Sequence, residues 1–263
     1  MSVVSTAFEK AAAENRAALV GYLPAGFPDK DTCIKAALAM AEAGADVIEV
    51  GLPYSDPLMD GPVIADAVYR ALKGGTKIAD VFDLVSAIAD AGTAAVVMTY
   101  WNPVDHYGAD AFARDLVNAG GAGLITPDLT PEEAQPWLDA SDAHGLDRIF
   151  LVAPSSPPER VAAITGLCRG FVYAVSLMGI TGARDALSSS AAGVVARIRE
   201  HTNLPAAVGV GVSTGAQARE VAGFADGVIV GSAFVRRLAD DQGIPAIRAL
   251  TSELAAAVRR PPP

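Results

Sequence analysis

Several residue types that carry chemistry are scarce in this chain of 263 residues. No lysine follows Lys77, which excludes a Schiff-base lysine from every later strand. The three histidines, His106, His144 and His201, are scattered and do not have the spacing of metal ligands. We therefore predict no metal site, and carboxylates remain as the best acid–base candidates.

Cysteine is nearly absent as well, since only Cys33 and Cys168 occur, far apart in sequence. Both fall in or near helical patterns and are interpreted as reduced, mostly buried thiols. No apolar run is long enough to span a membrane. Residues 1–16 mix charges into an alanine-rich segment, which predicts a helix rather than a signal peptide. These features predict a cytoplasmic protein.

Basic residues are outnumbered, with 20 Lys and Arg against 30 Asp and Glu and a net charge of −10. Such a balance argues against a nucleic-acid-binding surface. A phosphate-bearing ligand remains compatible with it, because backbone N–H groups can hold phosphate whatever the global charge.

What the chain has in quantity is apolar sequence, 51% of its residues, which is ample for one core and predicts a single domain over 1–263. Apolar strands alternate with helical patterns after an N-terminal helix over 1–15. The predicted strands are 18–22, 46–50, 95–99, 123–126, 149–153, 171–175, 206–210 and 227–230. The predicted helices include 31–43, 62–73, 78–91, 109–119, 131–144, 158–167, 191–201 and 215–222. Eight such units predict an α/β fold of the (β/α)₈ TIM-barrel type; the alternative, an open doubly wound sheet, usually has fewer strands.

Two carboxylates flank the first of two long loops, at 51–61. Glu49 lies on a strand predicted to be buried on both faces, where an ionised carboxylate is costly and its pKa should rise toward neutrality. Asp60 lies in the loop and is expected to be able to stay ionised. Two carboxylates in different environments can divide acid and base roles. Asp56, in an Asp-Pro pair, is given a structural role.

Glycines follow the last two strands, as Gly209-Val210-Gly211-Val212-Ser213 and Gly231-Ser232. In barrels the corresponding loops commonly bind phosphate against helix N-termini, with Ser213 and Ser232 as further donors. The second long loop, at 176–190, predicts a segment that closes over the site; a surface loop is the plainer alternative. Tyr22, Tyr100 and Tyr173, near strand ends, could form aromatic walls or pack in the core.

The run from Glu49 to Pro62, with Gly179-Ile180-Thr181-Gly182, Gly209-Val210-Gly211 and Gly231-Ser232, resembles the tryptophan synthase alpha subunit. The resemblance extends in order from about Phe8 to the last helix. It implies a lyase that splits indole-3-glycerol phosphate into indole and glyceraldehyde 3-phosphate by a retro-aldol step, in tryptophan biosynthesis.

The resemblance also implies a role for each matching residue. The family's acid–base glutamate falls on Glu49, and the aspartate that holds the indole N–H falls on Asp60, onto which Thr181 closes. Residues implied to line the indole pocket are Tyr22, Tyr100, Leu124, Leu151 and Tyr173, and those implied to bind phosphate are Gly182, Gly211, Gly231 and Ser232. No cofactor is implied in this chain; pyridoxal phosphate is expected only in a partner beta subunit, within an α₂β₂ assembly, docked on 53–56 and Asn102-Pro103.

The chain departs from the family at a few positions. Tyr22 and Tyr54 stand where many members have Phe, Met59 replaces a smaller residue, and Leu177-Met178 replaces a more polar pair. Two other functions are weighed: a docking or activating subunit with little turnover of its own, and a related barrel such as an indole-glycerol-phosphate synthase or a phosphoribosylanthranilate isomerase. The synthase relies on strand-end lysines, which are missing after Lys77.

Overall fold

The computed structural model describes residues 2–175, 184–239 and 243–261. Its strands form one parallel sheet in the order β5-β4-β3-β2-β1-β9-β8-β7-β6. Their bounds are β1 Ala18–Pro24, β2 Val47–Gly51, β3 Ala94–Met98, β4 Gly123–Ile125, β5 Asp147–Ile149, β6 Leu151–Val152, β7 Val172–Val175, β8 Ala206–Gly209 and β9 Gly227–Val230.

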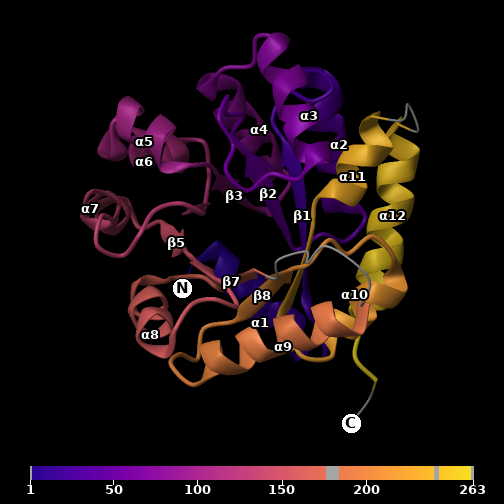
Figure 1. Cartoon of the computed structure of the whole chain (residues 1–263). Coiled ribbons are helices and arrows are strands. Elements are labelled where there is room, and N and C mark those ends of the chain that lie inside the picture. The colour runs from indigo at the N-terminus through magenta and orange to yellow at the C-terminus, as the bar shows by residue number, and fades with distance from the viewer. Residues whose placement is uncertain (1, 176–183, 240–242, 262–263) are drawn as a thin grey trace.

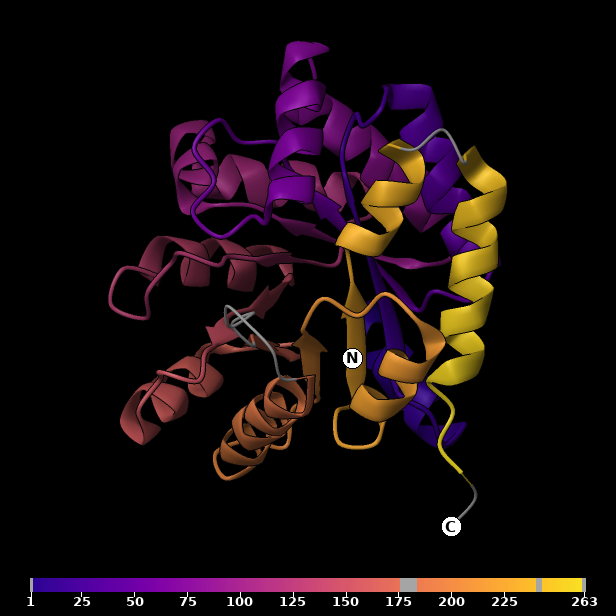
Figure 2. The same ribbon diagram turned by 45° about the vertical axis from the view of Figure 1, so that its right-hand side comes forward.

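Helices surround the strands on the outside (Figures 1 and 2). Their bounds are α1 Val3–Ala13, α2 Lys30–Glu42, α3 Pro62–Lys73, α4 Ile78–Asp90, α5 Trp101–Tyr107, α6 Ala109–Asn118, α7 Gln135–His144, α8 Pro158–Leu167, α9 Arg184–Arg199, α10 Gly215–Ala222, α11 Ser232–Ala239 and α12 Gly243–Ala257. The larger of the two apolar clusters fills the layer between strands and helices. The predicted (β/α)₈ barrel is confirmed.

The fifth barrel strand is interrupted at Phe150. Its first half, β5, pairs with β4, and its second half, β6, pairs with β7, so the two ends of the sheet meet within one continuous stretch of chain. We predicted one strand over 149–153, which begins too late. The charged pair Asp147-Arg148 resembles a loop in sequence, yet both side chains are buried.

The barrel interior holds a second, smaller cluster of inward-facing strand residues. Helix α1 covers the end of the barrel where the strands begin, and its Val4, Phe8 and Ala11 belong to this cluster. The rings of Phe8 and Phe171 stack with centroids 5.2 Å apart. The predicted N-terminal helix therefore closes the end of the barrel where the strands begin.

Three helical predictions need correction. α9 begins at Arg184, so residues 184–190, predicted as loop, are helical; a run of serines disfavours helix in isolation, but Val194 and Val195 bury one face of this helix. α7 begins at Gln135 rather than at residue 131, after a turn closed by the Glu133 N–H on the Thr130 carbonyl. α5 was not predicted, because it contains Pro103, which a first turn accommodates.

Candidate active site

Glu49 lies near the carboxyl end of β2 and points into the barrel, on the same strand face as Val47. It stands in register with Tyr22 of β1 and Val96 of β3. Its side chain is 1% exposed, and its Oε2 has no hydrogen-bond partner among the described residues. Burial, and secondarily the charge of Asp60, raises its pKa to about 8. The predicted burial of Glu49 is confirmed, and the carboxyl group is held protonated near neutral pH.

Asp60 closes the loop that leads from β2 to α3, directly before Gly61 and the N1 proline of α3. It is half-buried, and the Tyr100 hydroxyl donates to its Oδ1 at 3.2 Å. The same hydroxyl accepts the Met59 N–H at 2.9 Å, so Tyr100 fixes this end of the loop. Burial raises the pKa of Asp60, and the hydrogen bond from Tyr100 opposes the rise. The two carboxyl groups therefore occupy different environments, as predicted.

Tyr22 and Tyr173 lie in the same interior as Glu49. Burial raises the pKa of both phenols far above the usual value, and the charge of Glu49 adds to the rise for each. The Tyr22 ring rests against Gly51 and Gly231, and the Tyr173 ring against Gly209. A Cβ at Gly51 or Gly209 would collide with a ring, and one at Gly231 would contact the Tyr22 ring tightly, which explains why glycine stands at the ends of β2 and β8 and directly after β9.

Leu151 and Tyr173 are partners in the register of β6 and β7, and both pack on the interior cluster. The structure thus brings Leu151, Tyr22 and Tyr173 to the carboxyl end of the barrel, with Tyr100 at its rim. The Tyr54 ring packs on Tyr100 with centroids 5.5 Å apart, and its hydroxyl accepts from Asn102 Nδ2 at 3.0 Å.

Leu124 does not join this group. It pairs with Val97 of β3 and with Arg148 of β5, and it packs in the outer cluster beneath the helices. Its neighbour Ile125 faces the barrel interior instead, beside Met98. The placement of Leu124 in the pocket is therefore corrected by one residue: β4 is apolar on both faces, so the sequence lacks the alternation that would separate inward from outward positions.

The glycine-rich loops after β8 and β9 are adjacent, because these two strands pair. Gly211 has φ +73°, in the left-handed region that favours glycine. Ser232 is the first residue of α11, so the backbone N–H groups of this helix start point toward the loops. The Ser213 hydroxyl donates to Gln217 Oε1 at 3.1 Å and is thereby engaged within α10. Thr181 and Gly182 lie outside the described residues.

Neither a metal centre nor a membrane span is found in the part of the chain that the structure describes. No group of three or more His, Cys, Asp and Glu side chains there is placed to hold a metal ion. Likewise, none of the described helices combines the length and the apolar character needed to cross a bilayer.

The fold defines a (β/α)₈ barrel, and its carboxyl end holds a buried carboxyl group with a raised pKa, an arrangement typical of enzyme active sites. A sequence model of the family described as tryptophan synthase alpha chain matches residues 8–259. The tryptophan synthase alpha chain of Mycobacteroides abscessus is 60% identical over 253 residues, covering 96% of both chains.

Solved structures agree with these matches. A Mycobacterium tuberculosis tryptophan synthase structure superposes with a TM-score of 0.93 at 57% identity, covering 99% of each chain. The alpha subunit of tryptophan synthase from Legionella pneumophila gives 0.89 at 33% identity, covering 98% of each. This chain belongs to the tryptophan synthase alpha chain family, whose members are lyases that cleave indole-3-glycerol phosphate. The other indole-related barrels considered above are set aside.

Proposed function

We propose that this chain, acting as one catalytic unit over 1–263, performs the family's retro-aldol cleavage through Glu49 and Asp60. The observation that carries the proposal is the environment of Glu49: fully buried, inward-facing, and with a pKa of about 8. A carboxyl group with such a pKa can both give and take a proton near neutral pH, which is what a reaction with two proton transfers requires.

The proton sequence follows from that pKa. Protonated Glu49 gives its proton to indole C3, which places positive charge on the indole nitrogen; Asp60 accepts the N–H hydrogen bond and stabilises this charge. The Glu49 carboxylate then takes the proton of the glycerol hydroxyl as the bond between C3 and the glycerol carbon breaks. Indole keeps the electron pair, the glycerol carbon becomes the aldehyde, and Glu49 is protonated again.

The remaining site residues bind the two ends of the substrate in this proposal. Tyr22, Tyr100, Leu151 and Tyr173 line the indole pocket together with Ile125, which takes the place of Leu124. Gly211, Gly231 and Ser232 bind the phosphate group through backbone N–H groups, together with Gly182 from the segment after β7. Thr181 of the same segment closes onto Asp60. The phosphate assignment is supported by the adjacency of the loops after β8 and β9.

A beta subunit receives the indole in the proposed assembly, an α₂β₂ tetramer in the cytoplasm. The alpha chain itself needs no cofactor, and pyridoxal phosphate belongs to the beta subunit. Leu58 and Met59, which are 75% and 47% exposed in the loop beside Asp60, support docking at this face, because adjacent exposed apolar side chains are typical of interaction surfaces.

The decisive experiment measures indole release from indole-3-glycerol phosphate by wild type and Glu49→Ala, each with and without a beta subunit. We expect the variant to lose at least about 10²-fold in rate, the usual contribution of an acid–base group. Glu9→Ala, an exposed glutamate on α1, is the matched control and should keep full activity.

Substrate binding and partner activation separate the remaining possibilities. Glu49→Ala should still bind the phosphate substrate, because the phosphate loops lie after other strands. Full turnover by Glu49→Ala would overturn the role of Glu49. Absence of cleavage by folded wild type that still activates a beta subunit would instead favour the docking function.

A further inference from the structure

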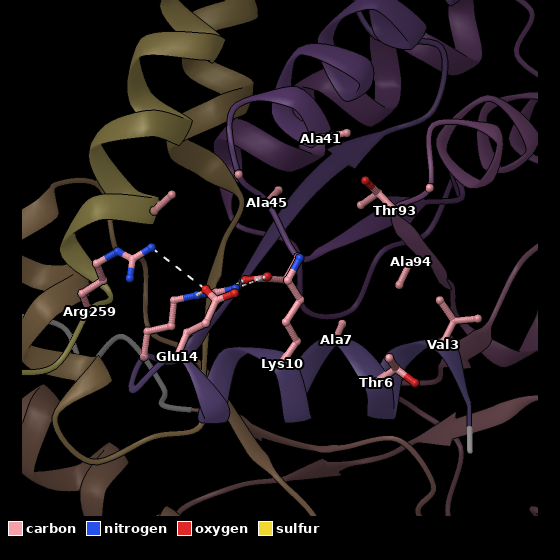
Figure 3. A pocket seen from close by; sticks show the side chains of 15 residues that line it. Val3, Thr6, Ala7, Lys10, Glu14, Ala41, Ala45, Thr93, Ala94 and Arg259 are labelled. Atoms are coloured by element: carbon pink, nitrogen blue, oxygen red, sulfur yellow. Dashed lines mark hydrogen bonds and ion pairs between the residues drawn. The ribbon is translucent and has the colours of Figure 1, made fainter.

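A cavity lies at the opposite end of the barrel from Glu49, where the strands begin. Its volume is about 460 Å³, within the range of about 300–1,000 Å³ usual for small-molecule sites. One wall is the helix α1, and the others are segments that lead into β2 and β3 and the end of α12 (Figure 3). The family reaction leaves this cavity without a role.

The wall formed by α1 is one continuous stripe of the helix. Val3, Thr6, Ala7, Lys10 and Glu14 recur at intervals of three and four residues, so they share one helix face, and Figure 3 shows them side by side along the cavity. The opposite face of α1 buries Val4, Phe8 and Ala11 in the barrel. The helix is therefore fixed from behind and presents a defined polar stripe to the cavity.

Small side chains form most of the remaining surface. Alanines contribute the apolar part of the lining, with glycines and two threonine hydroxyls beside them: Ala41, Ala45, Ala94, Ala255, Gly44, Gly92, Thr6 and Thr93. Such a wall places short apolar side chains beside polar groups, and it can accommodate a flat ring or a short aliphatic chain.

The charged groups of the cavity are unequal in number, with three cations, Lys10, Arg16 and Arg259, against Glu14 and Asp46. Arg16 is fully engaged: its Nη1 and Nη2 donate to Asp46 at 2.6 and 2.8 Å, and its Nε donates to Glu14 at 2.8 Å. Arg16 thus donates to both carboxylates, and Asp46 also accepts the Leu19 N–H at 2.8 Å.

Three cations against two carboxylates give the lining a net charge of +1, and two of the cations stay outside the hydrogen bonds that Arg16 makes. Arg259 approaches Glu14 only at 4.0 Å, and Lys10 has no ion-pair partner among the described residues. Both act electrostatically on Glu14, whose pKa is lowered first by Arg16 and then also by Lys10 and Arg259. The two cations therefore face one region from different elements, with an apolar wall next to them.

We propose that this cavity binds a small organic carboxylate, whose carboxylate group contacts Lys10 and Arg259 and whose apolar body lies on the alanine-lined wall. The bound molecule would join three segments that are distant in sequence: α1, the entry to β2, and the end of the chain. Binding to the folded state alone also raises the melting temperature. Phosphate lacks the apolar body and should bind more weakly.

The test uses the full chain and sodium benzoate as probe, with sodium chloride to match ionic strength. We expect saturable shifts of the backbone amide NMR signals of Thr6, Lys10 and Thr93, and a rise in melting temperature. The double variant Lys10→Gln, Arg259→Gln should weaken benzoate binding at least tenfold. Indole release should stay at the wild-type level in this variant, since both residues are remote from Glu49.

Matched variants keep the result interpretable. Lys35→Gln with Arg219→Gln removes the same two charge types at exposed positions elsewhere, and this pair should bind benzoate normally. Thr6→Trp, at the exposed rim, should block the cavity with both cations in place. Unchanged affinity in the Lys10 and Arg259 variant would overturn the proposal, as would shifts that do not saturate. Equally tight binding of neutral benzyl alcohol would overturn the carboxylate assignment.

Discussion

Glu49 combines two properties that oppose each other in a folded protein, an ionisable group and complete burial. Its neighbours Tyr22 and Tyr173 add ring surface and hydroxyl groups but no positive charge, and within the described residues burial and the charge of Asp60 both disfavour its ionised form. The resulting pKa of about 8 suits proton exchange. The same environment makes the ionised residue a burden on the folded state.

The shifted pKa of Glu49 makes the free energy of unfolding depend on pH. The pKa of Glu49 is near 4.5 in the unfolded chain and about 8 in the folded one, so the folded state binds the extra proton between these values. The stability that protonated Glu49 contributes to the folded state is therefore fully present below pH 4.5. It is lost as pH rises toward 8, at about 1.4 kcal/mol per pH unit at most.

We predict that Glu49→Gln, which cannot ionise, gains stability relative to wild type as pH rises from 5 to 8. The measurement is urea unfolding of both proteins across this range. Glu133→Gln, an exposed glutamate, serves as control and should track wild type at every pH. A difference between Glu49→Gln and wild type that does not change with pH would show that Glu49 ionises in the folded state as it does in the unfolded one.

Single residues also mark the limit of prediction from sequence. Glu49 could be identified because a carboxylate is conspicuous in an apolar strand, and Asp60 because it closes a loop broken by prolines. Leu124 was misplaced because its apolar neighbours offer no contrast between faces. Tyr100 could be predicted near the site, but its two hydrogen bonds to the Met59–Asp60 segment depend on the path of a loop that no local pattern specifies.

At the scale of elements, strand existence was predictable and strand limits were less so. Buried parallel strands are recognised as apolar runs, so β5 was shortened in the prediction when Asp147 and Arg148 interrupted the run. Arg148 is retained in this buried position by hydrogen-bond acceptors on neighbouring helices, including Asp142 at 2.7 Å and the Leu167 carbonyl at 3.0 Å. Such tertiary partners are not visible in local sequence.

Helix α1 gives a prediction at this scale. Phe8 is 3% exposed and stacks on Phe171 of the barrel interior, so Phe8→Ala should lower the free energy of unfolding by about 3–5 kcal/mol, as for other buried Phe truncations. Urea unfolding measures the loss. Glu9→Ala on the exposed side of the same helix should cost far less, since alanine is the better helix former. An equal loss in both variants would mean that packing of Phe8 in the barrel does not determine the effect.

At the scale of the whole molecule, the two ends of the barrel differ in kind. The end at which the strands finish carries the carboxyl pair and the exposed loop with Leu58 and Met59, which are 75% and 47% exposed. The end at which they begin is covered by α1 and contains the cation-lined cavity. Partner binding is thus proposed at the first of these ends, and binding of the small organic carboxylate at the second.

This separation predicts that Leu58→Arg weakens association with a beta subunit at least tenfold, because it places a charge in an apolar contact. Titration of labelled alpha chain with beta subunit gives the dissociation constant. Val117→Arg, at an exposed apolar position on α6, is the matched control and should leave the constant unchanged. Equal weakening by both variants would indicate a nonspecific effect of added charge.

The interrupted fifth strand has one further consequence. Around most of the ring each strand forms ladders with neighbours on both sides, whereas β5 forms a ladder only with β4 and β6 only with β7. A backbone hydrogen bond from the Arg169 N–H to the Arg148 carbonyl links β5 to the segment before β7. At Phe150 the barrel is therefore closed by the covalent backbone between β5 and β6, whereas elsewhere it is closed by hydrogen-bonded ladders between strands. We expect the barrel to open first at Phe150, between two halves that each keep their own ladders intact.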